Sequence, residues 1–281
     1  MIHLGMHTDN WRTLSGNYRA AVESAVKNGL SYIEFGVIHG HYFVQGLGYD
    51  PAISLWSNPR ALKPLPRRPR PEGVADRRRL PAHGAGRRRF GVPYVQQAIR
   101  FAAEIGCPCV DTTDGATRPE GYSDAEVFRL TCDNYRQCLT WAEDYGIVVN
   151  VETHGPYTTD PAFLGRLFDT FPSRSLGFNF DTGNTFIAGH DPLDYLKRFR
   201  DRLTHCHVKD VSPSLAAAVR GQETGIATSE VPIGAGVNAD NIRKVIAYLR
   251  ETHWDGVLSI ECYGSDANVR ESVRFLRGLL A

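Results

Sequence analysis

A regular alternation of short apolar runs and helical patterns constrains this chain more than any other feature. Seven runs rich in β-branched and aromatic residues alternate with seven segments that repeat apolar residues at helical spacing. This alternation predicts a parallel sheet, and 281 residues suit one closed α/β barrel, the (β/α)8 or TIM barrel. We therefore expect a single domain over residues 1–281. The expected strands cover residues 2–8, 32–38, 108–115, 147–155, 176–184, 204–210 and 256–264.

Residues 57–90 interrupt the pattern where the third strand is due. From Arg60 to Arg89, 11 basic residues stand against Glu72 and Asp76 for a net +9, so with a total of +1 the remainder carries −8. Prolines and arginine triplets leave no alternating apolar face, so we expect this region to be aberrant or disordered and to supply no well-packed strand. Three interpretations stay open: a basic loop for an anionic partner, a solvated insertion, or a shifted reading frame, which we favour.

Several classes of protein fit the sequence poorly. No apolar run approaches the roughly 18 residues of a membrane span, and the N-terminus lacks a basic start followed by an apolar stretch. The six cysteines are scattered, which predicts reduced thiols and a cytoplasmic location. The acidic remainder argues against nucleic acid and suits a metal site. A homo-oligomer is compatible with the sequence, but the oligomeric state stays open.

Ionisable residues stand at the carboxyl ends of the last four expected strands, where a TIM barrel has its active site. These residues are Glu152, Asp181, His207 and Glu261. Three carboxylates and an imidazole that converge in a barrel mouth repel one another unless a cation neutralises them. The mostly oxygen donor set predicts a divalent metal, Mn²⁺ first, with Mg²⁺, Co²⁺ and Zn²⁺ as alternatives.

Other polar residues near these strand ends are candidates for binding the substrate. His154 and His205 each lie two residues from an expected ligand, so they face the same way along an extended strand. A hydrogen bond within the core is the alternative role for each. The full candidate set is His7, Glu34, His154, Asn184, His205 and Lys209. A long insertion, residues 212–230, is expected to cover the site as a lid or to contact a neighbouring subunit.

Five motifs carry a resemblance to a known family. The stretches "NVETHG", "FNFDTGN", "HCHVKD", "VPIGAGVN" and "LSIECYG" resemble the xylose-isomerase-like barrel superfamily of sugar isomerases and epimerases, over residues 1–56 and 91–281. The resemblance implies Glu152, Asp181, His207 and Glu261 as metal ligands, with Glu152 and Glu261 as the acid/base pair. Two departures stand out: Asn184 replaces a histidine of several relatives, and Ala235 replaces a frequent acidic residue.

The resemblance implies a metal-dependent isomerase or epimerase of a small sugar or keto-sugar. The sequence shows no Gly-rich phosphate cradle, which favours a substrate without a phosphate group, and the phosphorylation of the substrate stays open. A carboxylate removes the proton next to the carbonyl, and the metal stabilises the resulting enediolate. A lyase or dehydratase is the alternative, because it begins with the same proton abstraction and then expels a β-substituent. Two further alternatives are a nucleic-acid repair enzyme on the same barrel, which needs more zinc ligands, and a damaged barrel with little activity.

Overall fold

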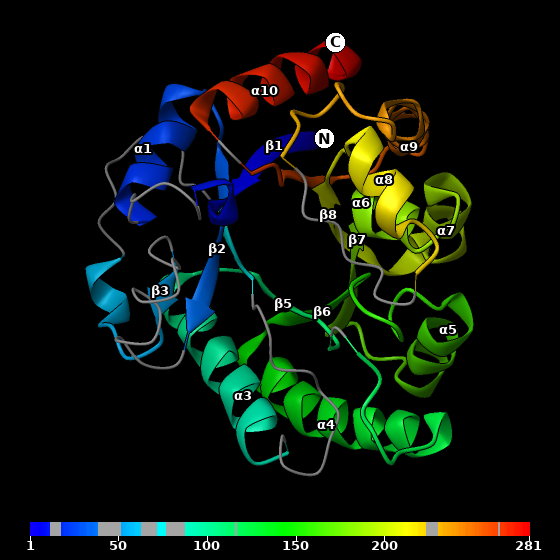
Figure 1. Cartoon of the computed structure of the whole chain (residues 1–281). Helices are drawn as coiled ribbons and strands as arrows, with labels where there is room; N and C mark the ends of the chain where they lie inside the picture. The colour runs from blue at the N-terminus through cyan, green and yellow to red at the C-terminus, as the bar shows by residue number, and fades with distance from the viewer. Residues whose placement is uncertain are drawn as a thin grey trace.

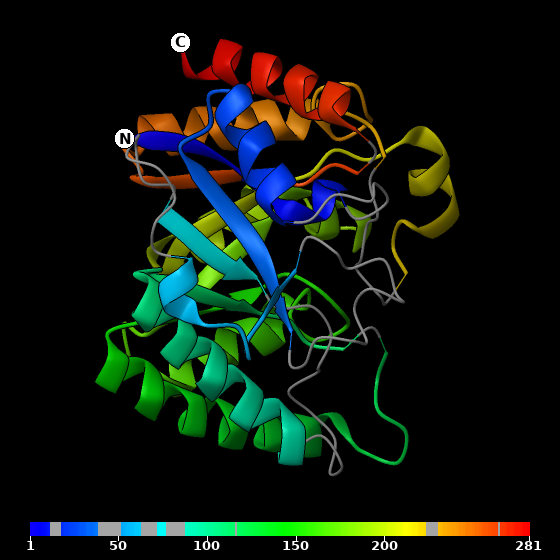
Figure 2. The ribbon, with the colours of Figure 1, turned by 90° about the vertical axis from the view of Figure 1, so that its left-hand side faces the viewer.

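Parallel pairing closes the sheet of this protein into a ring (Figures 1 and 2). The computed structural model describes residues 1–11, 18–38, 52–62, 72–76, 88–115, 117–222, 230–263 and 265–281. Within them, β1 pairs with both β2 and β9, which closes the ring and confirms the TIM barrel. Around the ring the strands are β1 (Ile2–His7), β2 (Tyr32–Ile38), β4 (Glu72–Asp76), β5 (Cys109–Thr112), β6 (Val148–Glu152), β7 (Leu176–Asp181), β8 (Leu203–Val208) and β9 (Gly256–Ile260). The short β3 (Ile53–Ser54) pairs in parallel with Val37 and Ile38 at the end of β2.

Helices surround the ring, as the view down the barrel in Figure 1 shows. Residues near the two ends of the chain come together, because β1 and β9 are neighbours and the terminal ammonium of Met1 pairs with Asp255 at 2.8 Å. The described helices are α1 (Tyr18–Lys27), α3 (Arg88–Ile105), α4 (Asp124–Tyr145), α5 (Pro161–Thr170), α6 (Thr182–Ile187), α7 (Pro192–Arg198), α8 (Pro213–Val219), α9 (Ala239–Glu251) and α10 (Asp266–Leu280). The 3-10 turns are η1 (Thr8–Trp11), η2 (Pro59–Ala61) and η3 (Arg200–Arg202).

The third barrel strand requires a correction. We expected no packed strand within residues 57–90, yet β4 pairs with β2 over five positions and with β5 at Val74 and Ala75. A parallel ladder needs only backbone N–H and C=O groups, and this strand contains no proline, so the surrounding arginines do not prevent it. The side chains of β4, and residues 63–71 and 77–87 beside it, lie outside the described residues. Their aberrant character therefore stays a prediction.

Side chains on the strands alternate between an apolar outer layer and a polar interior. On β7, Phe178 and Phe180 pack among the aromatic side chains outside the barrel, whereas Asn179 and Asp181 contact polar groups inside it. This is the period of two that a strand imposes. The six cysteines are all buried and free, as their scattered positions predict. The barrel therefore takes its apolar stability from the layer between sheet and helices, and its interior is available for chemistry.

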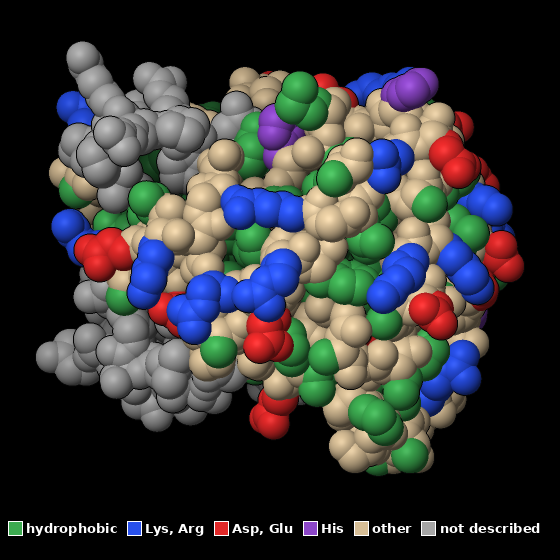
Figure 3. Space-filling view, turned by 90° about the horizontal axis from the view of Figure 1, so that it is seen from above, with side chains coloured by type: hydrophobic (Ala, Val, Ile, Leu, Met, Phe, Trp, Pro, Cys, Tyr) green, Lys and Arg blue, Asp and Glu red, His purple; other side chains and the backbone are tan. Residues whose placement is uncertain are grey.

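The outer surface carries charges of both signs. Figure 3 looks onto the side of α9 and α10, where Lys and Arg side chains alternate with acidic ones and apolar surface. Arg270 and Arg274, for example, are exposed on α10 with Glu271 beside them. Among the described residues no helix is both long and apolar enough to cross a membrane.

Asp210 fixes the glycine-rich loop that precedes α9. Its carboxylate accepts hydrogen bonds from the backbone N–H groups of Val211, Gly234, Gly236 and Asn238, at 2.8–3.0 Å. A Cβ at Gly236 would lie 2.3 Å from the Val211 carbonyl oxygen, so the close approach requires glycine there. The loop therefore closes over one end of the barrel around a single buried carboxylate.

We predict that Asp210→Ala will lower the free energy of unfolding by about 3 kcal/mol or more, because each lost hydrogen bond to a charged group contributes roughly 1.5–3 kcal/mol. Urea unfolding followed by circular dichroism measures this change. Asp144→Ala on the exposed end of α4 is the control and should stay within about 0.5 kcal/mol of the original protein. Equal effects of both substitutions would contradict the role of Asp210.

Candidate metal centre

Four neighbouring strands, β6 to β9, bring four potential ligands together at their carboxyl ends. One donor atom each from Glu152, Asp181, His207 and Glu261 lies within 4.8 Å of the other three, and all four side chains are buried. Nδ1 of His207 lies 3.3 Å from Glu152 Oε1, 3.3 Å from Glu261 Oε2 and 3.8 Å from Asp181 Oδ2. The four residues that the sequence predicts as ligands therefore surround one point in the barrel mouth.

Local backbone contacts fix two of these carboxylates. Asp181 is the N-cap of α6, and its Oδ1 accepts from the N–H groups of Gly183 and Asn184 at 2.8 Å, which directs Oδ2 into the mouth. Glu261 follows the last residue of β9. The Asn10 side chain donates to the Ile260 carbonyl at 3.0 Å and accepts from Cys262 N–H at 2.6 Å, so the backbone is held on both sides of Glu261.

Lys209 places a positive charge among the carboxylates. Its Nζ lies 2.8 Å from Asp181 Oδ2 and 2.9 Å from Glu261 Oε2, and it donates to Asn184 Oδ1 at 3.3 Å. The stem of Lys209 passes so close to Gly183 that a Cβ there would lie 2.7 Å from Lys209 Cγ. Asn184 in turn donates to Glu152 Oε1 at 3.3 Å. Lys209 and Asn184 therefore contact the predicted ligands directly, and their role in substrate binding stays a prediction.

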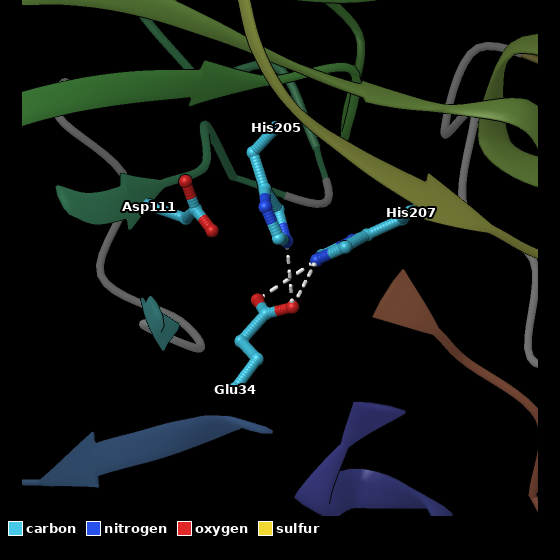
Figure 4. A group of neighbouring side chains, drawn as sticks. All are labelled: Glu34, Asp111, His205 and His207. Atoms are coloured by element: carbon cyan, nitrogen blue, oxygen red, sulfur yellow. Dashed lines mark hydrogen bonds and ion pairs between the residues drawn. The ribbon is translucent and has the colours of Figure 1, made fainter. Parts of the chain in front are cut away.

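His207 has a second carboxylate partner on its other ring nitrogen. Its Nε2 lies 2.8 and 2.9 Å from the two oxygens of Glu34 (Figure 4). Glu34 also contacts His205 Nε2 at 3.1 Å and Ser259 Oγ at 2.7 Å, while His7 Nε2 lies 3.6 Å from it. His7, Glu34 and His205 thus form a buried group directly beside the ligand group, and His207 belongs to both.

The mutual burial of these charges shifts their pKa values. Burial alone lowers the pKa of the His207 imidazolium, but the charges of Glu34 and Glu152 outweigh burial and hold that pKa well above its usual value. Burial likewise opposes the charge of Lys209, yet Asp181 and Glu261 raise its pKa above the usual value. The pKa of Glu34 is well below normal, because His207 and His7 overcome the effect of burial. Without a metal, the two cationic side chains therefore compensate the carboxylates.

A lower polar layer escaped the sequence analysis. On each of the strands β6 to β9, the residue two positions before the ligand also faces the interior and is polar. These residues are Asn150, Asn179, His205 and Ser259. Only His205 was singled out from the sequence, although the spacing of two identifies the whole set. Asp111 on β5 was also missed; it accepts a hydrogen bond from Asn150 Nδ2 at 2.6 Å.

The remaining predicted elements have mixed outcomes. His154 lies in the loop after β6, where its backbone N–H donates to Thr158 Oγ1 at 2.9 Å. The role of its side chain in substrate binding stays a prediction. The insertion at 212–230 begins as α8, whose N-cap Ser212 accepts from Leu215 N–H. Residues 223–229 lie outside the described residues, so the lid and the subunit contact also stay predictions.

The donor set fits a divalent cation. Oxygens of the three acids lie 3.3–3.8 Å from Nδ1 of His207, and the contact with Glu152 is a long hydrogen bond. An ion with bonds of roughly 2.1 Å spaces neighbouring ligands about 3.0–3.5 Å apart. Three carboxylate oxygens and one imidazole nitrogen also suit hard or borderline metals. Glu152, Asp181, His207 and Glu261 could therefore hold one cation.

Comparisons with known proteins identify the family and the fold of this chain. A family model described as a xylose isomerase-like TIM barrel matches residues 67–279. Among curated proteins, inosose dehydratase of Clostridium botulinum (strain Alaska E43 / Type E3) is 26% identical over 145 residues, which are 48% of this chain and 47% of that protein. The chain thus matches about half of the length of this relative.

Solved structures share the fold over nearly the whole chain. A D-tagatose 3-epimerase-like protein superposes with a TM-score of 0.77 at 22% identity, covering 99% of this chain and 97% of that one. The IOLI protein, solved with a zinc atom bound, gives a TM-score of 0.72 at 15% identity, covering 99% and 96%. At these identities the likeness establishes the fold.

The position of Lys209 generates a prediction about metal affinity. An incoming cation must compete with the ammonium for Asp181 and Glu261, and like charges about 4 Å apart repel by several kcal/mol at an effective dielectric constant of about 20. Lys209→Met keeps the length of the stem and removes the charge, so it should tighten binding of Mn²⁺ or Co²⁺ by about tenfold or more. Isothermal titration calorimetry measures this affinity.

The matched control for this substitution is Lys244→Met on the exposed face of α9, which should leave the affinity unchanged. The Lys209 variant should also show a larger gain in melting temperature on metal addition. Without metal, it has no ammonium group to neutralise the negative charges of Asp181 and Glu261. Weaker metal binding by Lys209→Met than by the original protein would refute the competition.

Proposed function

Because this chain belongs to the xylose isomerase-like TIM barrel family, we propose that it is a divalent-metal-dependent isomerase or epimerase of a small sugar or keto-sugar. The observation that carries the proposal is the placement of Glu152 and Glu261. They come from the two outer strands of the arc β6 to β9, and each lies 3.3 Å from His207 Nδ1. Two carboxylates thus flank the centre from different sides.

The proposed reaction moves a proton between the two faces of a substrate carbon next to a carbonyl. A bound cation, for which Mn²⁺ is our first choice, would polarise the carbonyl oxygen and stabilise the negative charge that develops on it. One glutamate accepts the proton from the carbon, which leaves an enediolate. The other glutamate returns a proton to the opposite face, so that the configuration inverts and no oxidant is required.

Lys209 and Asn184 are the proposed partners of the substrate hydroxyl groups. Lys209 carries three N–H donors, and Asn184 presents both a donor and an acceptor, so together they can recognise neighbouring oxygens of a polyol. Both side chains are buried beside the two glutamates. A substrate that bridges them would have its reacting carbon between Glu152 and Glu261. Proposed roles for His7, His154 and His205 in substrate binding rest on sequence position.

A dehydratase is the second candidate, and one observation favours it: the curated relative above is an inosose dehydratase. The same base would remove the proton next to the carbonyl. The bond between the β-carbon and its hydroxyl would then break, and the hydroxyl would leave as water after taking a proton from the second acid. Product mass separates the two reactions, because epimerisation conserves mass and dehydration loses water.

We predict that Glu152→Gln and Glu261→Gln will each lower turnover by about 10²–10⁴-fold while the fold remains, because general acid/base catalysis contributes roughly that factor. Assays with D-tagatose and with an inosose in deuterium oxide, with Mn²⁺ added, should show deuterium incorporation at the exchanged carbon. Nuclear magnetic resonance and mass spectrometry measure the exchange and the product.

Glu251→Gln, an exposed change at the end of α9, is the matched control and should behave like the original protein. Removal of metal with a chelator should abolish turnover, and addition of Mn²⁺ should restore it. A Glu261→Gln protein that turns over at an undiminished rate with metal bound would show that Glu261 is only a ligand. Product formation without any solvent deuterium would argue for a transfer shielded from water.

A further inference from the structure

Glu34 lies at the centre of a buried group that shares His207 with the ligand set, and Glu34 itself has no step in the proposed reaction. Figure 4 shows its carboxylate facing the ring nitrogens of both His205 and His207, with Asp111 to one side. These four residues also offer donor atoms within 4.8 Å of one another, so the group has the composition of a second metal site. Two roles are therefore open for Glu34: ligand of a second cation, or partner that orients His207.

The distances distinguish these roles. Glu34 lies 2.8 and 2.9 Å from His207 Nε2, a length that places a shared proton between oxygen and nitrogen and leaves no room for an ion. On the opposite side of the same ring, the carboxylates of the ligand group stand 3.3–3.8 Å from Nδ1. His207 therefore makes its shortest contacts with Glu34 through Nε2, and its Nδ1 faces the ligand carboxylates, Glu152 included, at the longer spacing that ligands of one cation share.

The other partners of Glu34 support a hydrogen-bonded carboxylate. Ser259 donates to Oε2 at 2.7 Å, and His205 Nε2 lies 3.1 Å from the same oxygen. Oε1 lies 2.8 Å from His207 Nε2, so both oxygens of Glu34 have a hydrogen-bond partner. Asp111, the fourth member of the group, is engaged elsewhere by the Asn150 amide at 2.6 Å. Since the negative charge of Glu34 is already compensated, the group does not require a second cation.

Asn179 makes a further polar contact with His207 Nε2. Nδ2 of Asn179 lies 3.1 Å from His207 Nε2. The buried Oδ1 of Asn179 has no hydrogen-bond partner among the described residues. The two ends of an amide are interchanged by a rotation of 180°. In the rotated orientation Oδ1 instead faces Nε2, where it can share the N–H that Glu34 also accepts, so this contact is compatible with a proton on that nitrogen.

We propose that Glu34 is a positioning residue that holds the proton of His207 on Nε2 and thereby makes Nδ1 the metal ligand. A carboxylate behind a ligating histidine fixes the tautomer and the orientation of the ring, and loss of such a partner typically weakens metal binding by about 10–100-fold. His205 and Ser259 hold Glu34 in turn. The inference rests on the metal centre of the proposed function and is independent of which reaction occurs there.

The test is a titration of the full-length protein with Co²⁺ alone, followed by calorimetry and visible absorption. Glu34→Gln should weaken Co²⁺ binding by about 10–100-fold and alter the ligand-field bands, because the ring is no longer held. Asp111→Asn is the matched control: it removes a carboxylate from the same group without touching His207, and it should change the affinity less than about threefold. The original protein should bind one Co²⁺ per chain.

A second measurement uses the unaltered protein and does not depend on whether a variant folds. Nitrogen-15 spectra of the histidine rings in the Zn²⁺-loaded protein should show His207 protonated on Nε2 and metal-bound through Nδ1. Metal on Nε2 would overturn the proposal. So would two Co²⁺ per chain that fall to one in Asp111→Asn, or equal affinities of Glu34→Gln and the original protein.

Failure of this inference is distinguishable from failure of the proposed function. Tight binding of one Co²⁺ through Nδ1 of His207 without sugar turnover would support the role of Glu34 and refute the reaction. Sugar turnover by the original protein, together with an unchanged metal affinity in Glu34→Gln, would support the reaction and refute the role of Glu34. A protein that binds no Co²⁺ would refute both.

Discussion

Compensation of buried charge is the constraint on which the interior of this barrel depends. Carboxylates withdrawn from water are costly unless a cation or several hydrogen-bond donors stabilise them. Here Lys209 forms ion pairs with Asp181 and Glu261. His207 lies between Glu34 and the ligand carboxylates. Because the same two cationic groups stabilise the protein without metal, a bound cation must take over part of their role. Metal affinity and stability are thus properties of one set of side chains.

The stagger of the strands explains how this set forms. Asp181 on β7 pairs in register with His207 on β8, and His207 pairs with Ser259 on β9. Glu261 therefore stands two residues further along its strand than the partner of His207. Since strands in a barrel tilt, this stagger brings residues from different register rows to the same depth. The same geometry places Ser259 below the metal centre, where it contacts Glu34.

The sequence predicts the barrel and the convergence of the four candidate ligands, because both depend on local patterns, while the role of these residues as ligands stays a prediction. An acidic residue at the end of an apolar run can be recognised from the sequence, and the closed ring then brings the ends of these strands together. The lower layer was missed because single polar residues such as Asn150 or Ser259 inside an apolar strand resemble ordinary core residues. Their meaning depends on contacts across the ring, such as the one between Glu34 on β2 and His207 on β8. The strand β4 was missed for another reason, since backbone pairing can form in a composition that side-chain patterns disfavour.

The asparagine at position 184 follows from the lysine at position 209. Asn184 donates to Glu152 through Nδ2 and accepts from Lys209 through Oδ1, so it links the two sides of the centre. An amide offers a donor and an acceptor at every pH, whereas a protonated imidazole offers two donors and would repel the ammonium. A histidine there, as in several members of the superfamily, would suit a centre without this lysine contact. Positions 184 and 209 are therefore coupled, and under the proposed function their pairing helps to decide which hydroxyl pattern of a substrate this centre accepts.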